Sequence, residues 1–325
     1  MEYPNLEQDF QTIPDSIIRS IATRLTDCLE KCGLYYRLFT RTKTAASTRA
    51  KLRAKNYQDG KRMQDLFGIR IAVYFQDDQA LCRRIIEDRF SVVSITEDRP
   101  DADTFSPTRL NFICKLPMNC RQELPGVIYE QYPIDTTVEI QLRTVFSEGW
   151  HEVEHDLRYK SKSDWAGSAD LSRALNGIFA TLITCDWSML NIFDKLCDRK
   201  YREKDWTAML KNKLRIHVEE QPLSPELCSL LDHRPELAAE LYQIDRFSLL
   251  DFLSDGRFPG ILLTLDHLVY LTNALVMHNP EITAMTPPEL LESIDACAQR
   301  ELLEETGIAD ARMKRICVYS VEGKT

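Results

Sequence analysis

The sequence predicts an α/β (α+β) protein, with a mixed β-sheet flanked by helices in the N-terminal half and an all-α region after it. Segments in which apolar and polar residues alternate, as in half-buried strands, recur between helical segments up to about residue 200. Beyond that point only helical periodicity recurs, and residues 219–310 hold 18 Asp or Glu against four Lys or Arg. We therefore expect two domains, residues 1–200 and an acidic helical accessory domain at 201–325.

Composition narrows the class of protein. With 44% hydrophobic and 28% charged residues, the 325-residue chain is typical of a soluble globular protein. The net charge of −9 argues against general coating of nucleic acid, and no apolar run approaches the roughly 18 residues of a membrane span. The ten cysteines include no CxxC motif, which favours reduced thiols. We expect a cytoplasmic protein with no membrane partner.

The first long helix is predicted at 14–33, with an apolar stripe and Gly33 at its end. Residues 41–62 then hold eight Lys or Arg and one acid. On a helix, Lys43, Ser47, Lys51 and Lys55 would share one face. Like charges at this spacing repel by a few tenths of a kcal/mol per pair, so the pattern suggests a bound anion such as a polyphosphate. A solvated basic helix is the alternative.

Four strands are predicted after this basic segment. The strand at 69–75 follows a turn that contains Asp65, and Arg70 points away from its apolar face. A helix at 78–89, a strand at 90–95 and a polar loop come next. In the strand at 109–116, Arg109 and Asn111 lie on the polar face, and in the strand at 136–144 Glu139, Gln141 and Arg143 do so. A solvated edge strand would show the same alternation.

The remaining segments are predicted to be helical. A helix at 145–160 has Phe146, Trp150, Val153 and Leu157 as its apolar side, and it carries His155 on its polar side. A lone histidine is more often structural than catalytic, but this one follows a polar-faced strand. A long helix is expected at 169–198, and further helices at 226–232, 235–254, 260–278 and 287–306.

Two acids from different segments, Asp65 and Glu139, are expected to converge beside many cations. Such a set predicts Mg²⁺ held by the two carboxylates and a nucleotide polyphosphate, where the metal would offset charge during phosphoryl-type transfer. The sequence has neither GxxxxGK[ST] nor GxGxxG. Side chains, rather than a glycine-rich loop, would then bind ATP.

Four motifs in order resemble the synthetase domain of the RelA/SpoT family over roughly residues 15–200. They are Arg41-x-Lys43-x3-Ser47-x3-Lys51, Asp65-Leu66-Phe67-Gly68-Ile69-Arg70-Ile71, Val138-Glu139-Ile140-Gln141-Leu142-Arg143-Thr144, and Trp150…Glu154-His155…Tyr159-Lys160. The resemblance implies a nucleotidyltransferase-like fold. It also implies a pyrophosphokinase of the stringent response, which moves the β,γ-pyrophosphate of ATP to the 3′-hydroxyl of GDP or GTP, giving (p)ppGpp and AMP.

The same resemblance implies roles for individual residues. Asp65 would bind Mg²⁺, and Glu139 would bind Mg²⁺ and take the proton of the 3′-hydroxyl. ATP would be bound by Arg41, Lys43, Ser47, Lys51 and Arg70. The cleft and the acceptor side would be lined by Arg109, Asn111, Gln141, Arg143 and His155.

One departure from the family concerns the acceptor. The family has a Tyr-x-Ser-x-His run at the third strand, whose Tyr stacks on guanine, but here Pro107, Arg109 and Asn111 occupy those three places. Loss of a base stack removes about 1–3 kcal/mol of affinity. An adenosine nucleotide, or the 3′ end of tRNA as in some toxic small members, is therefore an alternative acceptor.

Two further readings stay open from the sequence. The N-terminal domain is either an enzyme or a non-catalytic nucleotide-binding module. The acidic helices would serve a homo-oligomer, bind a regulatory protein partner, or restrain a toxic synthetase in cis.

Overall fold

The computed structural model describes residues 3–55, 57, 60–97, 110–254 and 263–294. The chain divides into two units. The first comprises Met1–Asp27 and Tyr36–Met189, and the second comprises Cys28–Tyr35 and Leu190–Thr325. Among the helices within the described ranges, none is both long enough and apolar enough to cross a bilayer.

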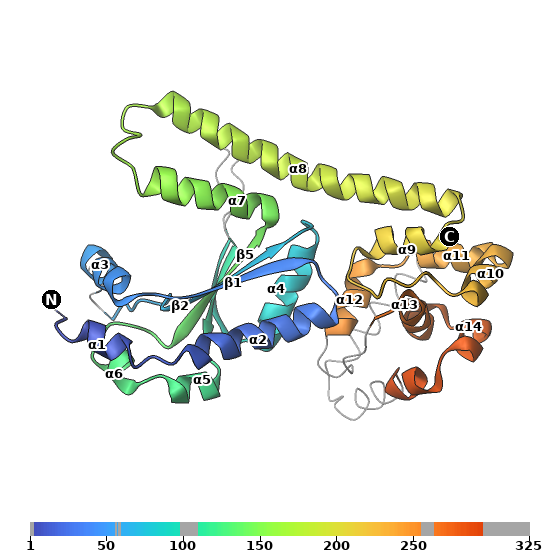
Figure 1. The fold of residues 1–325 in the computed structure, drawn as a ribbon, viewed down its shortest axis with the longest axis horizontal. Helices are drawn as coiled ribbons and strands as arrows, with labels where there is room; N and C mark the ends of the chain where they lie inside the picture. Colours follow the sequence, from blue (N-terminus) through green and yellow to red (C-terminus); the bar gives the residue numbers. More distant parts are fainter. Residues whose placement is uncertain (1–2, 56, 58–59, 98–109, 255–262, 295–325) are drawn as a thin grey trace. The chain divides into compact units, whose positions relative to one another are not determined.

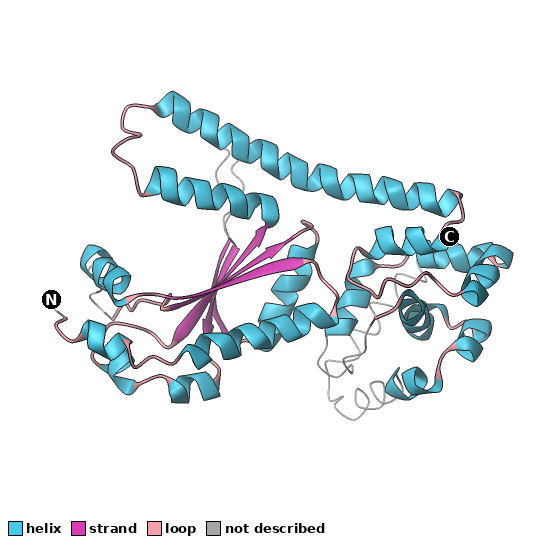
Figure 2. Cartoon of the chain, in the orientation of Figure 1, coloured by secondary structure: helices cyan, strands magenta, loops and turns pink. Residues whose placement is uncertain are grey.

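The first unit is built on a mixed five-stranded sheet with the order β1-β2-β5-β4-β3, drawn in magenta in Figure 2. Only β2 and β5 run parallel, and the other neighbouring pairs are antiparallel. This confirms the predicted mixed sheet. The strands are β1 (Tyr36–Thr42), β2 (Phe67–Val73), β3 (Val92–Glu97), β4 (Leu110–Lys115) and β5 (Thr137–Thr144).

The register of the sheet gathers its polar side chains on one face. Gly68 pairs with Glu139, and Arg70 pairs with Gln141, across the parallel strands. Residues paired in this way point to the same face, and β1 adds Arg41 opposite Gly68. The other face forms the core, where the buried side chains include those of Ile69, Ile71, Phe112, Val138 and Ile140.

Helices cover the sheet, and Figure 1 shows α2 and α7 on opposite sides of it. The predicted helix at 14–33 is α2 (Asp15–Lys31), whose side chains Ile17, Ile21 and Leu25 are fully buried. Both α2 and α8 continue into the second unit. The other helices here are α1 (Leu6–Phe10), α3 (Ala45–Lys55), α4 (Asp78–Arg89), α5 (Met118–Glu123), α6 (Gly126–Glu130), α7 (Val145–Val153), the π-helix η1 (Glu154–Tyr159) and α8 (Ala169–Arg202).

The basic segment differs from its prediction. Strand β1 was not predicted, because as an edge strand it is largely exposed and its burial does not alternate. Helix α3 begins only at Ala45, because Thr44 Oγ1 accepts a hydrogen bond from the Ser47 backbone N–H (3.2 Å) and caps the helix. Lys43 therefore precedes the helix instead of sharing its face.

The helix predicted at 145–160 is also different. It is α-helical only to Val153, and from Glu154 it continues as η1. Trp150 is buried as predicted, but Val153 is 46% and Leu157 is 64% exposed. The change to a π-helical repeat alters which side chains share a face, so a period of 3.6 residues places Leu157 wrongly.

Every described element of the second unit beyond Leu190 is helical, which confirms the predicted all-α region. The helix predicted at 235–254 is two helices, because Asp245 Oδ2 accepts a hydrogen bond from the Ser248 N–H (3.1 Å) and starts a new one. Helices α9 and α14 were not predicted, and the helix predicted at 287–306 extends past the described residues. The helices are α9 (Trp206–Leu214), α10 (Pro225–His233), α11 (Pro235–Tyr242), α12 (Arg246–Ser254), α13 (Leu265–Thr272), η2 (Asn273–Met277) and α14 (Pro280–Met285).

Candidate active site

A polar pocket of about 410 Å³ lies on the outward face of the sheet, where β1, β2, β5 and α7 meet. Cations and carboxylates line it together, which suits a charged ligand better than an apolar one. The lining residues are Phe39, Thr40, Arg41, Gly68, Ile69, Arg70, Glu139, Gln141, Glu148 and Glu152.

Arg70 is held on three sides within this pocket. Its Nε donates to Gln141 Oε1 (3.1 Å), and its Nη1 donates to Glu148 Oε1 (2.5 Å) and to Glu152. Burial disfavours the charged guanidinium, but the hydrogen bonds and charges of Glu148 and Glu152 outweigh burial and raise the pKa of Arg70 above its ordinary value. Arg70 is therefore a fixed positive charge.

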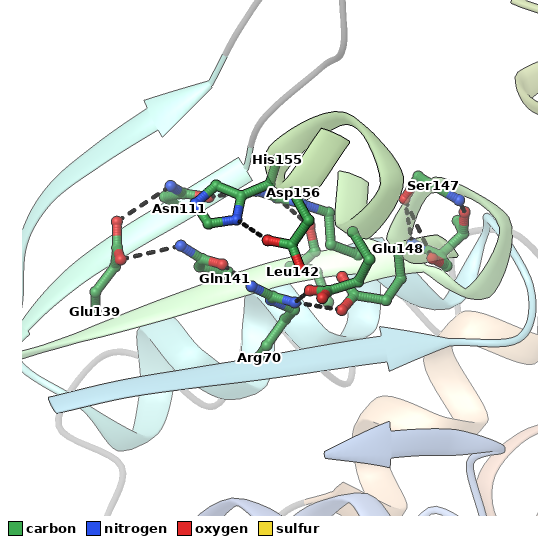
Figure 3. A network of polar contacts seen from close by, with 12 residues as sticks. Arg70, Asn111, Glu139, Gln141, Leu142, Ser147, Glu148, His155 and Asp156 are labelled. Carbon is green, nitrogen blue, oxygen red and sulfur yellow. Dashed lines mark hydrogen bonds and ion pairs between the residues drawn. The ribbon is translucent and has the colours of Figure 1, made fainter. Parts of the chain in front are cut away.

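Glu139 is oriented by two side-chain amides. Asn111 Nδ2 donates to Oε1 (3.2 Å) and Gln141 Nε2 donates to Oε2 (3.0 Å), as Figure 3 shows. Arg143 is buried and donates to Asn111 Oδ1 (3.1 Å) and to the Leu142 carbonyl (2.8 Å). Arg143 thus positions Asn111, and Asn111 in turn positions Glu139.

Asp65 is bound by two lysines just before β2. Its Oδ2 lies 2.5 Å from Lys51 Nζ and 3.2 Å from Lys43 Nζ. Burial alone would raise the pKa of Asp65, but the hydrogen bonds and charges of Lys51 and Lys43 outweigh burial and lower the pKa below 3.8. Burial, helped by the charges of Arg41 and Lys51, lowers the pKa of Lys43 below 10.5 despite its contact with Asp65.

Asp65 has one oxygen that could bind a magnesium ion shared with phosphates. Asp65 Oδ1 is buried and has no hydrogen-bond partner, which leaves a charged oxygen for a further ligand. Mg²⁺ in nucleotide sites is held by one or two carboxylates together with phosphate oxygens and water. Across the described residues, no group of three or more His, Cys, Asp or Glu side chains is arranged to hold a metal. Asp65 is not among the described residues that line the pocket with Glu139, so a Mg²⁺ ion held by both carboxylates stays a prediction.

The other predicted site residues have different surroundings. Ser47 is exposed on α3, and its Oγ accepts a hydrogen bond from Thr44 Oγ1 (3.0 Å). His155 lies on η1, where its Nδ1 is 2.9 Å from Asp156 Oδ1 and its ring stacks on Tyr159. His155 is not among the described residues that line the pocket. Arg109 lies outside the described residues.

Sequence reasoning gave no role to Glu148 and Glu152, although both line the pocket and bind Arg70. They are four residues apart on α7, so they share one side of the helix. The signal was a pair of acids, one turn apart, directly after a strand with a polar outer face. Glu148 is the more buried of the two, with a side chain 11% exposed against 55% for Glu152.

Comparison with known families identifies this part of the chain. Residues 40–164, which contain the whole pocket except Phe39, match the model of the region found in RelA / SpoT proteins. These residues are similar to that region, and we refer to residues 40–164 as the RelA/SpoT domain. The RelA/SpoT domain thus comprises all five strands except the beginning of β1, together with α3 to α7 and η1. No curated protein matches the chain.

The solved structures that are similar to this chain include small alarmone synthetases. Small alarmone synthetase 2 from Bacillus subtilis is 20% identical, with 54% of this chain and 90% of that one covered and a TM-score of 0.43. Small alarmone synthetase 1 from the same organism is 21% identical, with 57% and 91% covered and a TM-score of 0.43. Structures of synthetase 1 bound to its product pppGpp and to AMPCPP also match, with TM-scores of 0.42 and 0.38.

Proposed function

We propose that the RelA/SpoT domain is a nucleotide pyrophosphokinase, which transfers the β,γ-pyrophosphate of ATP to the 3′-hydroxyl of an acceptor and releases AMP. The main support is the charge arrangement around Asp65. The Oδ2 atom of this part-buried carboxylate contacts Lys43 and Lys51, and its buried Oδ1 has no hydrogen-bond partner. A metal bound to a triphosphate would satisfy that oxygen and both ammonium groups together.

The donor nucleotide would be bound by the cations on the sheet and on α3. We assign the triphosphate to Lys43, Lys51 and Arg41, with Ser47 as a hydrogen-bond donor from α3. Arg70 lines the pocket as a fixed charge and would contact the donor beside Arg41. When ATP binds, its phosphates would replace Asp65 as the groups that Lys43 and Lys51 contact.

The chemistry then requires a base near the acceptor. The 3′-oxygen attacks the β-phosphorus of ATP, the bond between that phosphorus and the α,β-bridging oxygen breaks, and AMP leaves with the electron pair. We assign Glu139 to receive the hydroxyl proton. The two amides on Glu139 use two of about four acceptor positions of a carboxylate, so a hydroxyl can also bind there.

Mg²⁺ would be held by Asp65 and Glu139 with the phosphates, and when bound it would offset the negative charge that develops between the leaving and attacking oxygens. Asn111 and Gln141 fix the orientation of Glu139 for this role, and Arg143 fixes Asn111. A base held in this way loses little rotational freedom when substrate binds.

The acceptor is left open between three classes. GDP or GTP is the acceptor implied by the family resemblance. An adenosine nucleotide or the 3′ end of tRNA is the alternative, because Pro107, Arg109 and Asn111 stand where the family has a Tyr-x-Ser-x-His run. Asn111 orients Glu139, whereas Pro107 and Arg109 lie outside the described residues.

The proposal is tested by incubating the full chain with Mg²⁺, γ-labelled ATP and each acceptor class in turn. We expect label in one acceptor, at its 3′-position, with one AMP released per transfer. If no acceptor leads to AMP release but the chain still binds ATP saturably, the non-catalytic nucleotide-binding module is favoured instead. Glu139→Gln distinguishes an enzyme from a binding module. The substitution should abolish turnover in an enzyme, and it should leave ATP binding unchanged in a binding module.

A further inference from the structure

One buried acid in the first unit has no role in the proposed chemistry. Asp186 lies on α8 and is only 3% exposed. Its Oδ2 accepts a hydrogen bond from Thr144 Oγ1 (2.8 Å), and its Oδ1 is buried with no hydrogen-bond partner among the described residues. Burial raises the pKa of Asp186 above its ordinary value, although the bond from Thr144 opposes this. A buried carboxyl group with an unpartnered oxygen destabilises a fold, so stability alone does not explain Asp186.

Thr144, the partner of Asp186, is the residue at which β5 ends and α7 begins. Its Oγ1 accepts a hydrogen bond from the Ser147 N–H (3.1 Å), and Ser147 Oγ accepts one from the Thr144 N–H (3.0 Å). These reciprocal bonds form a capping box, which fixes the first turn of the helix. A threonine hydroxyl has a single proton, and here that proton is donated to Asp186. Asp186 therefore holds the hydroxyl that caps α7.

The first turn of α7 also carries a carboxylate that binds Arg70. Glu148 follows Ser147 directly, and its Oε1 lies 2.5 Å from Arg70 Nη1, a contact drawn in Figure 3. The Glu148 side chain is only 11% exposed. Because closely packed surroundings leave such a side chain little room to adjust, a small change in the direction in which α7 leaves β5 would move Glu148 away from Arg70.

Helix α8 contacts α7 at a second point, two turns before Asp186. Phe179 packs on Trp150 with ring centroids 4.6 Å apart, and the Trp150 Nε1–H donates to the Leu175 carbonyl (3.4 Å). All of these residues belong to the first unit. The contact between the two rings is apolar and tolerates small shifts, whereas the hydrogen bond between Asp186 and Thr144 requires one geometry. That hydrogen bond therefore determines how α7 is set against α8.

We propose that Asp186 is a positioning residue for the pocket, which holds Glu148 on Arg70 through Thr144 and the capping box of α7. Buried polar groups are best attested in such a role, where they select one of several arrangements that bury the same apolar surface. The effect on Arg70 and Glu148 depends only on the fold. An effect on ATP binding rests on the proposed function, because it assumes that Arg70 contacts the donor.

A double-mutant cycle between Asp186 and Glu148 tests the proposal without any ligand. Glu148→Gln should lower the urea midpoint of unfolding in the wild-type chain. In an Asp186→Leu background it should lower the midpoint by about half as much or less, because Glu148 is no longer held on Arg70. The matched control is Asp170→Leu, which removes an exposed acid from the same helix and should leave the full effect of Glu148→Gln. Equal effects of Glu148→Gln in all three backgrounds would overturn the proposal.

Rescue by a conservative variant separates positioning from a general effect on folding. Asp186→Asn keeps an oxygen that can accept the hydrogen bond from Thr144, so Glu148→Gln should regain its full effect in that background. If Asp186→Asn behaves like Asp186→Leu, the hydrogen bond is not what positions α7, and the proposal fails. Asp186→Ala replaces Asp186→Leu in the cycle if circular dichroism shows that the leucine variant does not fold.

Binding of a non-hydrolysable ATP analogue to the full chain extends the test to the pocket. We expect Asp186→Leu to weaken binding by about tenfold, because Arg70 is no longer pre-organised, and Asp186→Asn to restore it. Equal or tighter binding by the folded Asp186→Leu variant would overturn the proposal. If the cycle shows coupling but the wild-type chain binds no ATP analogue, the positioning of Glu148 is upheld and the proposed function fails. If the wild-type chain binds the analogue but the cycle shows no coupling, only the positioning role of Asp186 is overturned.

Discussion

Arg70 and Glu148 form the most buried ion pair that lines the pocket, with Nη1 of Arg70 2.5 Å from Oε1 of Glu148. The other partner of Nη1, Glu152, is far more exposed. The structure thus offers two carboxylates on one guanidinium in different dielectric surroundings. The two carboxylates should therefore contribute unequally to the stability of the fold.

We expect Glu148→Gln to lower the free energy of unfolding by about 1–3 kcal/mol, because a part-buried guanidinium loses the more buried of its two counter-charges. Glu152→Gln should change it by less than about 0.5 kcal/mol, because solvent screens an exposed pair. Urea denaturation of both variants measures the difference. Equal losses would show that burial does not set the strength of this pair.

The lowered pKa of Lys43 predicts how ATP binding responds to alkaline pH. Burial, the largest cause, disfavours its charged form, so Lys43 loses its proton below 10.5 and its attraction for phosphate with it. The apparent affinity for ATP should fall on an alkaline limb below pH 10.5. Lys43→Arg should move that limb upward, since a guanidinium stays charged. Lys55→Arg, at the exposed end of α3, should leave the limb where it is.

Asp65 predicts a dependence of stability on acid pH. Its pKa is lowered in the folded protein, so the carboxylate stabilises the fold above pH 3.8, and this contribution is lost as the pH falls through the lowered pKa. Asp65→Asn should therefore be less stable than wild type at neutral pH, and the two should converge at low pH. A constant difference between them from pH 7 to pH 2 would contradict this account.

Gly33 ends α2 in the left-handed region, at φ +66°. A Cβ there would lie 2.7 Å from the His217 carbonyl oxygen. Because that oxygen belongs to the backbone, it can move away only if the backbone moves. We expect Gly33→Ala to lower the free energy of unfolding by about 2–4 kcal/mol, from the strained conformation and the close contact together. Gly167→Ala is the control, because Gly167 has φ +83° and no atom within 4 Å of such a Cβ. If Gly33→Ala lowers the free energy of unfolding no more than Gly167→Ala does, the backbone has moved to relieve the contact with the His217 carbonyl oxygen.

Much of the sheet could be predicted from the sequence because its strands alternate strictly. In β5, Val138, Ile140 and Leu142 are buried, and Glu139 and Gln141 line the pocket on the other face, as the alternation indicates. Strand β1 escaped prediction because an exposed edge strand leaves no such period. Leu157 was placed on the wrong face because a π-helix does not keep the α-helical repeat.

The site could be predicted only in part, for a related reason. Residue types in sequence indicate which side chains carry charge, but pairing depends on tertiary contacts. Lys43 and Lys51 were predicted to share a helix face, whereas they meet at Asp65 from a loop and a helix. Glu148 gave no signal of its own, because a helical acid looks solvated until its partner Arg70 is placed beside it.

The central claim concerns which phosphorus–oxygen bond of ATP is broken, and the position of a label on the β-phosphate tests it most directly. The full chain is incubated with Mg²⁺, β-labelled ATP and the acceptor found by the panel. We predict that the label leaves ATP with the γ-phosphate and is recovered on the acceptor, with unlabelled AMP as the second product, and that Asp65→Asn and Glu139→Gln abolish the transfer. Label recovered in ADP, or transfer that persists in both variants, would contradict the account.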